Sequence, residues 1–164
     1  MSEQRYQGAI RTDVPAGWFV KESITLLAPS GQANVIVSSE PLDPTLDSEQ
    51  YATAQGDLLR REFPGYVEHR FDRTAVFGMD GFLRQFEWTP PDGVRVAQVQ
   101  AYATRAGRGF TATGTAPATV AAEHTRTFLE VLRSIEIDDL GGSPGPGTTP
   151  RPRRGPAATV TWTG

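Results

Sequence analysis

The sequence has no cysteine, one lysine and two histidines among its 164 residues, and these shortages exclude several kinds of chemistry. Without cysteine there are no disulfide bonds, no thiolate metal ligands and no cysteine nucleophile. His69, in a predicted polar loop, and His124, in a predicted helix, belong to no His-x-x-x-His or His/Asp cluster. No ligand spacing indicates a metal site, and we expect neither a metal nor another cofactor.

The sequence also lacks motifs of common enzyme classes. No Gly-x-Ser-x-Gly nucleophile elbow occurs in residues 1–140. Gly107-Arg108-Gly109 begins like a dinucleotide-binding fingerprint, but Ala112 occupies the position of the third glycine. The segment also leads into a strand, where the fingerprint needs a helix. We interpret it as a hairpin turn and predict that the protein is not an enzyme.

Long hydrophobic runs are missing as well. No stretch approaches the roughly 18 apolar residues that a membrane-spanning helix needs. The start, Met-Ser-Glu-Gln-Arg, is not followed by the apolar core of a signal peptide. We therefore expect a cytoplasmic protein that does not insert stably into a membrane.

Charge and composition divide the chain at Gly141. Residues 1–140 contain 13 basic and 19 acidic residues, and this net charge of −6 argues against a nucleic-acid partner because it repels phosphate backbones. Residues 141–164 hold three arginines, no acidic residue and many prolines and glycines. Such a composition buries too little apolar surface to offset the entropy lost on ordering. The sequence predicts one domain over residues 1–140 and a disordered tail over residues 141–164.

Residues 1–140 combine strand patterns with two helical patterns. We expect strands at residues 24–28, 33–39, 71–77, 82–89, 94–104, 109–116 and 135–137, and helices at residues 48–63 and 117–134. Asp47 and Gln50 have the spacing of a capping box, and Leu58 and Leu59 are expected on the buried side of the first helix. Strands joined by hairpins, without β-α-β alternation, predict an α+β fold. We expect a twisted antiparallel sheet of about six to seven strands with two main helices.

Alternation along the strands separates the two faces of the sheet. Ala97, Val99, Ala101 and Ala103 share one face, and their small size predicts the side on which a helix packs. The opposite face carries the residues that we predict to bind a partner: Arg84, Phe86, Trp88, Gln98, Gln100 and Tyr102. That surface is partly polar and partly aromatic, unlike a core or an ordinary solvated face. The alternative interpretation, in which Phe86 and Trp88 belong to the core, stays open at this point.

Several short segments follow one another in an order typical of a known family. They are Pro15-Ala16-Gly17-Trp18, Ser48-Glu49-Gln50-Tyr51, Phe63-Pro64-Gly65-Tyr66, Phe82-Leu83-Arg84-Gln85-Phe86-Glu87-Trp88, Val96-Ala97-Gln98-Val99-Gln100-Ala101-Tyr102 and Phe110-Thr111-Ala112-Thr113-Gly114-Thr115-Ala116-Pro117. The order resembles the DcrB-related proteins, a bacterial domain family, over residues 6–137.

This resemblance implies a PsbP-like fold, in which helices pack on a twisted antiparallel sheet. Some members without a leader are the Eag chaperones of type VI secretion, homodimers that shield hydrophobic effector segments on a concave sheet surface. Other members carry a lipoprotein signal, which is not found at the start of this sequence. The Pro/Gly/Arg-rich tail departs from the chaperones, and we transfer no client-contacting residue from them.

The leading prediction is a non-catalytic protein-binding module. It would act as an adaptor or chaperone, as a homodimer, and shield apolar segments of a secretion-system or contractile-injection effector. The alternative is a sensor or carrier domain for a small ligand or lipid, in which the aromatic face lines a pocket.

Overall fold

The computed structural model describes residue 6 and residues 8–138, which fall into two units. The described helices and strands all lie in the unit Val20–Gly141. The described residues before Val20 form coil with one turn, in which the amide of Trp18 donates to the carbonyl of Pro15 at 3.1 Å. The predicted domain boundary after residue 140 and the predicted tail lie outside the described residues.

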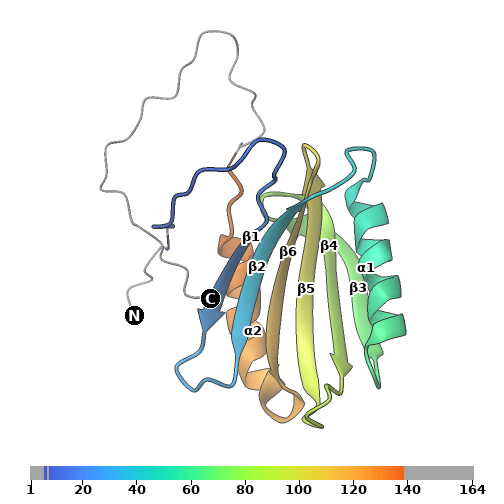
Figure 1. Cartoon of the computed structure of the whole chain (residues 1–164). Helices are drawn as coiled ribbons and strands as arrows, with labels where there is room; N and C mark the ends of the chain where they lie inside the picture. Colours follow the sequence, from blue (N-terminus) through green and yellow to red (C-terminus); the bar gives the residue numbers. More distant parts are fainter. Residues whose placement is uncertain (1–5, 7, 139–164) are drawn as a thin grey trace. The chain divides into compact units, whose positions relative to one another are not determined.

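One antiparallel sheet organises the second unit (Figure 1). Its strands are β1 (Glu22–Leu27), β2 (Asn34–Pro41), β3 (Val67–Val76), β4 (Met79–Trp88), β5 (Val96–Arg105) and β6 (Arg108–Pro117). They lie in the order β1-β2-β6-β5-β4-β3, so that β1 and β3 are the two edges. Strands β3 to β6 form the predicted meander, and the α+β fold class is confirmed.

The hairpin turns follow from local chemistry. Between β5 and β6, Ala106 and Gly107 both have positive φ, 52° and 72°, as a two-residue turn matched to the twist of the strands requires. Between β4 and β5, Gly93 has φ 80° and donates to the carbonyl of Pro90 at 2.9 Å. The Gly107-Arg108-Gly109 segment is therefore a hairpin connection, as predicted.

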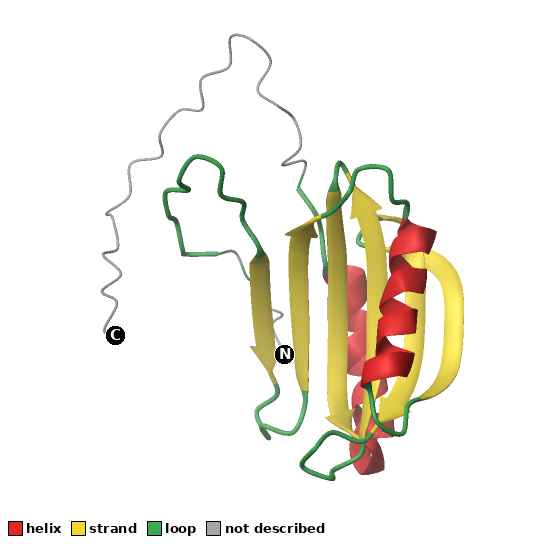
Figure 2. Ribbon diagram, turned by 45° about the vertical axis from the view of Figure 1, so that its right-hand side comes forward, coloured by secondary structure: helices red, strands yellow, loops and turns green. Residues whose placement is uncertain are grey.

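Two helices cover opposite faces of the sheet (Figure 2). Helix α1 (Ser48–Glu62) begins with the predicted capping box: the amide of Gln50 donates to Asp47 at 2.8 Å, and the amide of Asp47 donates to the Gln50 side chain at 3.0 Å. Leu59 is buried as predicted, but Leu58 is 41% exposed. The prediction for Leu58 is wrong because the buried side of α1 runs instead through Tyr51, Ala52 and Gly56.

Helix α2 (Ala121–Ser134) follows a short 3-10 turn (Ala118–Val120) and packs on the face predicted from its small residues. Ala101 and Ala103 are fully buried beneath it. The ring of Phe128 lies against Gly114, where an added Cβ would stand 2.6 Å from its Cγ atom. The absence of a side chain at Gly114 thus sets how closely α2 approaches β6.

Two local predictions are wrong. Residues 135–137 do not form a strand; Ile135 and Ile137 pack against the apolar core on the α2 side of the sheet. Partial burial of these two side chains holds the segment over the α2 side of the sheet, where its backbone does not pair with a strand. His69 lies in β3 and not in a loop, because a polar edge strand has no apolar alternation to reveal it.

Replacement of Gly114 by alanine tests the packing of α2. We expect Gly114→Ala to lower the free energy of unfolding by about 1–3 kcal/mol, because the added methyl group overpacks the contact with Phe128. Thr113→Ala, one residue away and on the other face, should change it by less than about 0.5 kcal/mol. Urea denaturation measures both values, and equal values for the two variants would contradict this packing account.

Candidate functional site

The residues predicted to bind a partner do share one face of the sheet. They are Arg84, Phe86, Trp88, Gln98, Gln100 and Tyr102. In the register of β4 and β5, Arg84 lies opposite Gln100 and Phe86 lies opposite Gln98. The alternation of side chains was therefore predicted correctly from the sequence.

Helix α1 covers part of this face, which corrects the prediction of an exposed surface. Arg84, Phe86 and Tyr102 are at most 1% exposed, so they are not available to a partner. Trp88 is half-buried: its ring stacks on Phe63 at 3.9 Å between centroids. Strand alternation says which side chains share a face but not where a helix will lie on it. The open alternative was thus right for Phe86 and partly right for Trp88.

Arg84 holds α1 against the sheet. Its Nε donates to Glu68 at 2.8 Å, both terminal nitrogens donate to the carbonyl of Ala52 at 3.2 Å, and Nη1 donates to the hydroxyl of Tyr102 at 3.0 Å. Its guanidinium carbon also lies 4.3 Å from the centroid of the Phe71 ring. A buried guanidinium needs such partners, because an uncompensated charge in the interior is strongly destabilising.

The helix approaches Arg84 closely because Gly56 has no side chain. An added Cβ at Gly56 would lie 2.3 Å from Nη2 of Arg84. A glycine inside a helix costs roughly 1 kcal/mol relative to alanine. Its presence in α1 is explained by the guanidinium beneath it.

Two pKa values reflect this cluster. Partial burial alone would raise the pKa of Glu68, but hydrogen bonds from Tyr66 and Arg84 and the positive charges of Arg84 and Arg60 outweigh burial and lower that pKa below 4.5. Burial raises the pKa of Tyr102 to about 12, so its hydroxyl stays protonated and donates to Gln100. At neutral pH the cluster therefore contains a carboxylate at Glu68, paired with both Arg84 and Arg60, and a neutral tyrosine at Tyr102.

Beyond α1, the same face continues as a surface of hydroxyl and amide groups, here called the open polar face. Its residues are Ser38, Gln98, Gln100, Thr111, Thr113 and Thr115, all half-buried and none charged. Ser38 and Thr111 are hydrogen-bonded at 2.8 Å, and Gln98 donates to Thr115 at 2.7 Å. Sequence reasoning missed the threonines, although their alternation with alanine and glycine in β6 was the available signal.

The sheet ends at an exposed edge, defined as strand β1 together with Ile36 of β2. Every residue of β1 is exposed. Leu27 is 74% exposed and Ile36 is 40% exposed, and Ile24 and Leu26 are also open to solvent. Sequence reasoning did not select these residues, because an apolar strand is expected to be buried.

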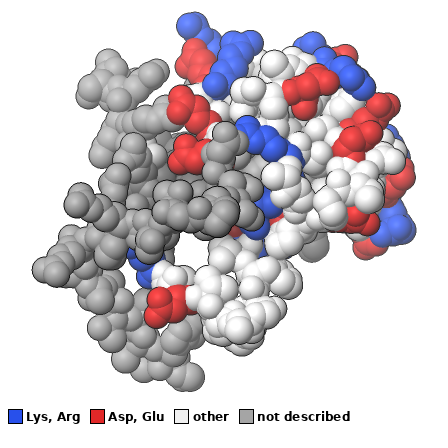
Figure 3. Space-filling view, turned by 90° about the horizontal axis from the view of Figure 1, so that it is seen from above, with Lys and Arg blue, Asp and Glu red and all other residues white. Residues whose placement is uncertain are grey.

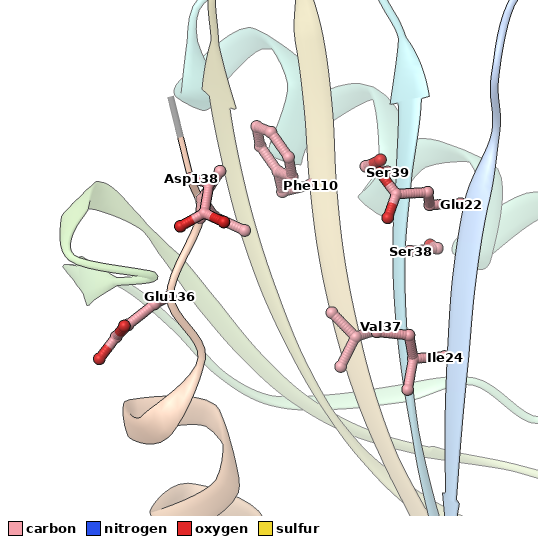
Figure 4. Close-up of a pocket in the computed structure, with 9 residues that line it drawn as sticks. Glu22, Ile24, Val37, Ser38, Ser39, Phe110, Glu136 and Asp138 are labelled. Carbon is pink, nitrogen blue, oxygen red and sulfur yellow. The ribbon is translucent and has the colours of Figure 1, made fainter. Parts of the chain in front are cut away.

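A pocket of about 180 Å³ lies beside the exposed edge, on the α2 side of the sheet. Its lining combines apolar and acidic side chains with two serines: Glu22, Ile24, Val37, Ser38, Ser39, Phe110, Glu136, Ile137 and Asp138. Figure 4 shows Ile24 and Val37 on neighbouring strands, with Glu136 and Asp138 on the segment that follows α2. Three of the nine lining residues are acidic and four are apolar.

Charges elsewhere on the described surface are mixed in sign. Figure 3 shows basic and acidic side chains next to one another on the visible part of the unit. Arg73, for example, pairs with Glu49 at 3.2 Å and with Asp80 at 3.3 Å. Within residues 6 and 8–138, no group of three or more histidine or acidic side chains is placed to hold a metal ion.

The sequence model of one protein family matches most of the chain. The DcrB model covers residues 12–134. The chain belongs to the DcrB family. This membership confirms the resemblance drawn from the short segments. No curated protein matches the sequence.

Solved structures resemble this DcrB-family chain at low sequence identity. The Pseudomonas aeruginosa protein PA94, described as a protein of unknown function and putative regulator, has a TM-score of 0.67 and 16% identity over 76% of this chain and 89% of its own. PA94 therefore shares the fold.

Two more structures match less closely. LpqN of Mycobacterium tuberculosis, described as involved in cell envelope biogenesis, has a TM-score of 0.46 and 15% identity over 68% of this chain and 67% of its own. PsbP of the cyanobacterium Synechocystis sp. PCC 6803 has a TM-score of 0.47 and 8% identity over 66% and 78%. In the described part of the DcrB-family chain, no helix is long and apolar enough to cross a membrane.

The lowered pKa of Glu68 predicts how stability depends on pH. A carboxyl group whose pKa is lower in the folded state stabilises the protein above its unfolded pKa, and this contribution is lost as pH falls through the folded value. The free energy of unfolding should therefore decrease below pH 4.5. Glu68→Gln should remove about 1–3 kcal/mol at pH 7 and flatten this acid dependence.

Denaturant unfolding between pH 7 and pH 3 measures this effect. Glu62→Gln, at an exposed glutamate near the end of α1, is the control and should follow the parent protein. An unchanged acid slope in Glu68→Gln would contradict the assigned role of Glu68.

Proposed function

We propose that this DcrB-family domain is a non-catalytic protein-binding module that covers an apolar segment of a client protein. One observation carries the proposal: the exposed edge leaves apolar side chains in solvent at one end of an otherwise packed sheet. Ile24, Leu26, Leu27 and Ile36 are all exposed there. Ile24 and Leu26 lie on the α2 side and Leu27 and Ile36 on the other, so both faces of the edge carry adjacent exposed apolar residues, and these mark an interaction site more often than single ones do.

The surroundings of the edge suit a protein client. Burial of apolar area stabilises a complex by roughly 25 cal/mol per Å², and the hydroxyl and amide groups of the open polar face can hydrogen-bond at the rim. The six residues of that face are uncharged, and Glu40, the next residue along the same side of β2, is already paired with Lys21 at 3.3 Å and accepts a hydrogen bond from Tyr51.

The finer role rests on family resemblance. We propose an adaptor or chaperone, acting as a homodimer in the cytoplasm, for an effector of a secretion or contractile-injection machine. PA94, which shares the fold, is described as a putative regulator, and regulators commonly act by binding. A small-ligand carrier is less well supported, because the pocket of about 180 Å³ is smaller than the roughly 300–1,000 Å³ of typical ligand sites.

The test uses two substitutions at equally exposed apolar positions. Clients are first identified by affinity capture from the native host and mass spectrometry, and then titrated against the purified protein. Ile36→Glu should weaken binding by about tenfold or more, because a charge would be buried in the interface. Leu58→Glu, on α1 and equally exposed, should leave the affinity unchanged.

Both variants should fold, since both side chains face solvent. Equal affinities for the parent and the Ile36→Glu variant, or equal losses in both variants, would remove the exposed edge from the binding site. Hydrolysis or modification of a client by the parent protein would overturn the non-catalytic assignment.

A further inference from the structure

The two edges of the sheet differ in their protection against pairing with another strand. Edge strand β3 contains a bulge between Glu68 and Arg70 and carries further charges at Asp72 and Arg73. Bulges and charges are the usual devices that keep an edge from accepting a new strand. Strand β1 has neither a bulge nor a proline, and Glu22 is its one charged residue. The β1 edge is therefore left open to pairing.

The backbone of β1 can accept a partner along its outer side. The amide of Ala28, just after β1, donates to the carbonyl of Ala33, just before β2, at 2.9 Å. The register from Glu22 to Leu27 is regular, so amides at alternate positions point toward β2. The amides and carbonyls of Ser23, Thr25 and Leu27 consequently point outward from the sheet.

The side chains of β1 define what an added strand would meet. Ile24 and Leu26 pair with Val37 and Val35, whose side chains pack into the core on the α2 side. Alternation places Thr25 on the opposite face, beside the open polar face. An added strand would therefore meet Ile24 and Leu26 on one side, and Thr25 flanked by the apolar Leu27 and Ile36 on the other.

The negative charge of Glu22, at the start of β1, indicates a basic side chain in the partner. Glu22 precedes Ile24 on the same face, and both line the acidic pocket together with Asp138. A water molecule occupies roughly 30 Å³, so a pocket of about 180 Å³ holds several waters or, in their place, one side chain. The pocket thus suits an aliphatic stem that ends in a positive charge.

We propose that β1 is the docking strand for an extended segment of the client, which adds to the sheet as an antiparallel seventh strand. The segment carries apolar side chains opposite Leu26 and Ile24 and a lysine or arginine opposite Glu22. From its N-terminus to its C-terminus, this segment has the residue pattern apolar, polar, apolar, polar, basic. This inference rests on the proposed protein-binding function and specifies the mode and the chemistry of the partner.

A labelled peptide, Ser-Val-Thr-Val-Thr-Arg-Ser, is the probe for the full-length protein. Its first threonine, the third residue of the peptide, stands opposite Thr25, and fluorescence anisotropy measures the affinity of the peptide. Thr25→Pro should weaken binding by about tenfold or more, because proline removes an outward amide and leaves the β1–β2 hydrogen bonds in place. Thr25→Val keeps the amide and should bind as the parent does.

Modified peptides repeat the test without altering the protein. N-methylation of the first threonine of the peptide should abolish binding, because that amide faces β1, whereas N-methylation of the valine before it, whose amide faces away, should not. Replacement of the peptide arginine by glutamate should weaken binding to the parent protein. Glu22→Arg should reverse that preference. Equal binding of both N-methylated peptides, or an unchanged charge preference, would overturn the proposal.

Hydrogen exchange identifies other occupants of the edge. The Thr25 amide should exchange rapidly in the free protein and slowly with peptide bound. Slow exchange in the free protein would mean that the edge is already occupied, and this would overturn the proposal. The occupant would be a second copy if protection rises with protein concentration, and another segment of this chain if it does not.

The two proposals can fail separately. Client binding that is lost in Ile36→Glu but normal in Thr25→Pro would overturn strand addition and leave the protein-binding function standing. Absence of both client and peptide binding to the parent protein would overturn both.

Discussion

The buried guanidinium of Arg84 is the constraint on which the α1 side of the sheet depends. Its charge lies in the interior and is compensated by Glu68, the Ala52 carbonyl and Tyr102. One of these partners belongs to α1, so the helix completes the coordination of the charge as well as covering apolar rings. Gly56 provides the close approach that this contact requires. The position of α1 across β4 and β5 follows from these contacts.

The placement of α1 decides which part of that face stays open. Because the helix is held over β4 and β5, the hydroxyl and amide groups that extend over β6 and β2 have no helix above them. On the opposite face, α2 is drawn to the small residues of β5 and β6. Both helices thus lie over the central strands, and β1 is exposed along its length.

Uneven coverage would let the domain bind the proposed partner at one end without losing its fold. The packed core lies under the helices, and the apolar side chains of the exposed edge are not needed to complete it. The two edges also differ in chemistry: β3 is bulged and charged, whereas β1 is regular and largely apolar. In a sheet with one protected and one unprotected edge, another strand adds at the unprotected edge.

Features that depend on neighbouring residues could be predicted from the sequence. The capping box at Asp47, the hairpin turns and the alternation that places Arg84 and Gln100 on one face were all predicted, because each is set by local geometry. The resemblance of short segments also identified the DcrB family.

Only the tertiary structure decided which of those residues are accessible. Arg84 and Tyr102 have the composition of a binding surface, yet α1 buries them, and Leu58 and Leu59 are neighbours with opposite exposure. A helix can cover either half of a sheet without changing the local pattern. Long-range contacts, such as that between Gly56 and Arg84, determine which half of the sheet the helix covers. These contacts leave no pattern in the spacing of residues along the chain.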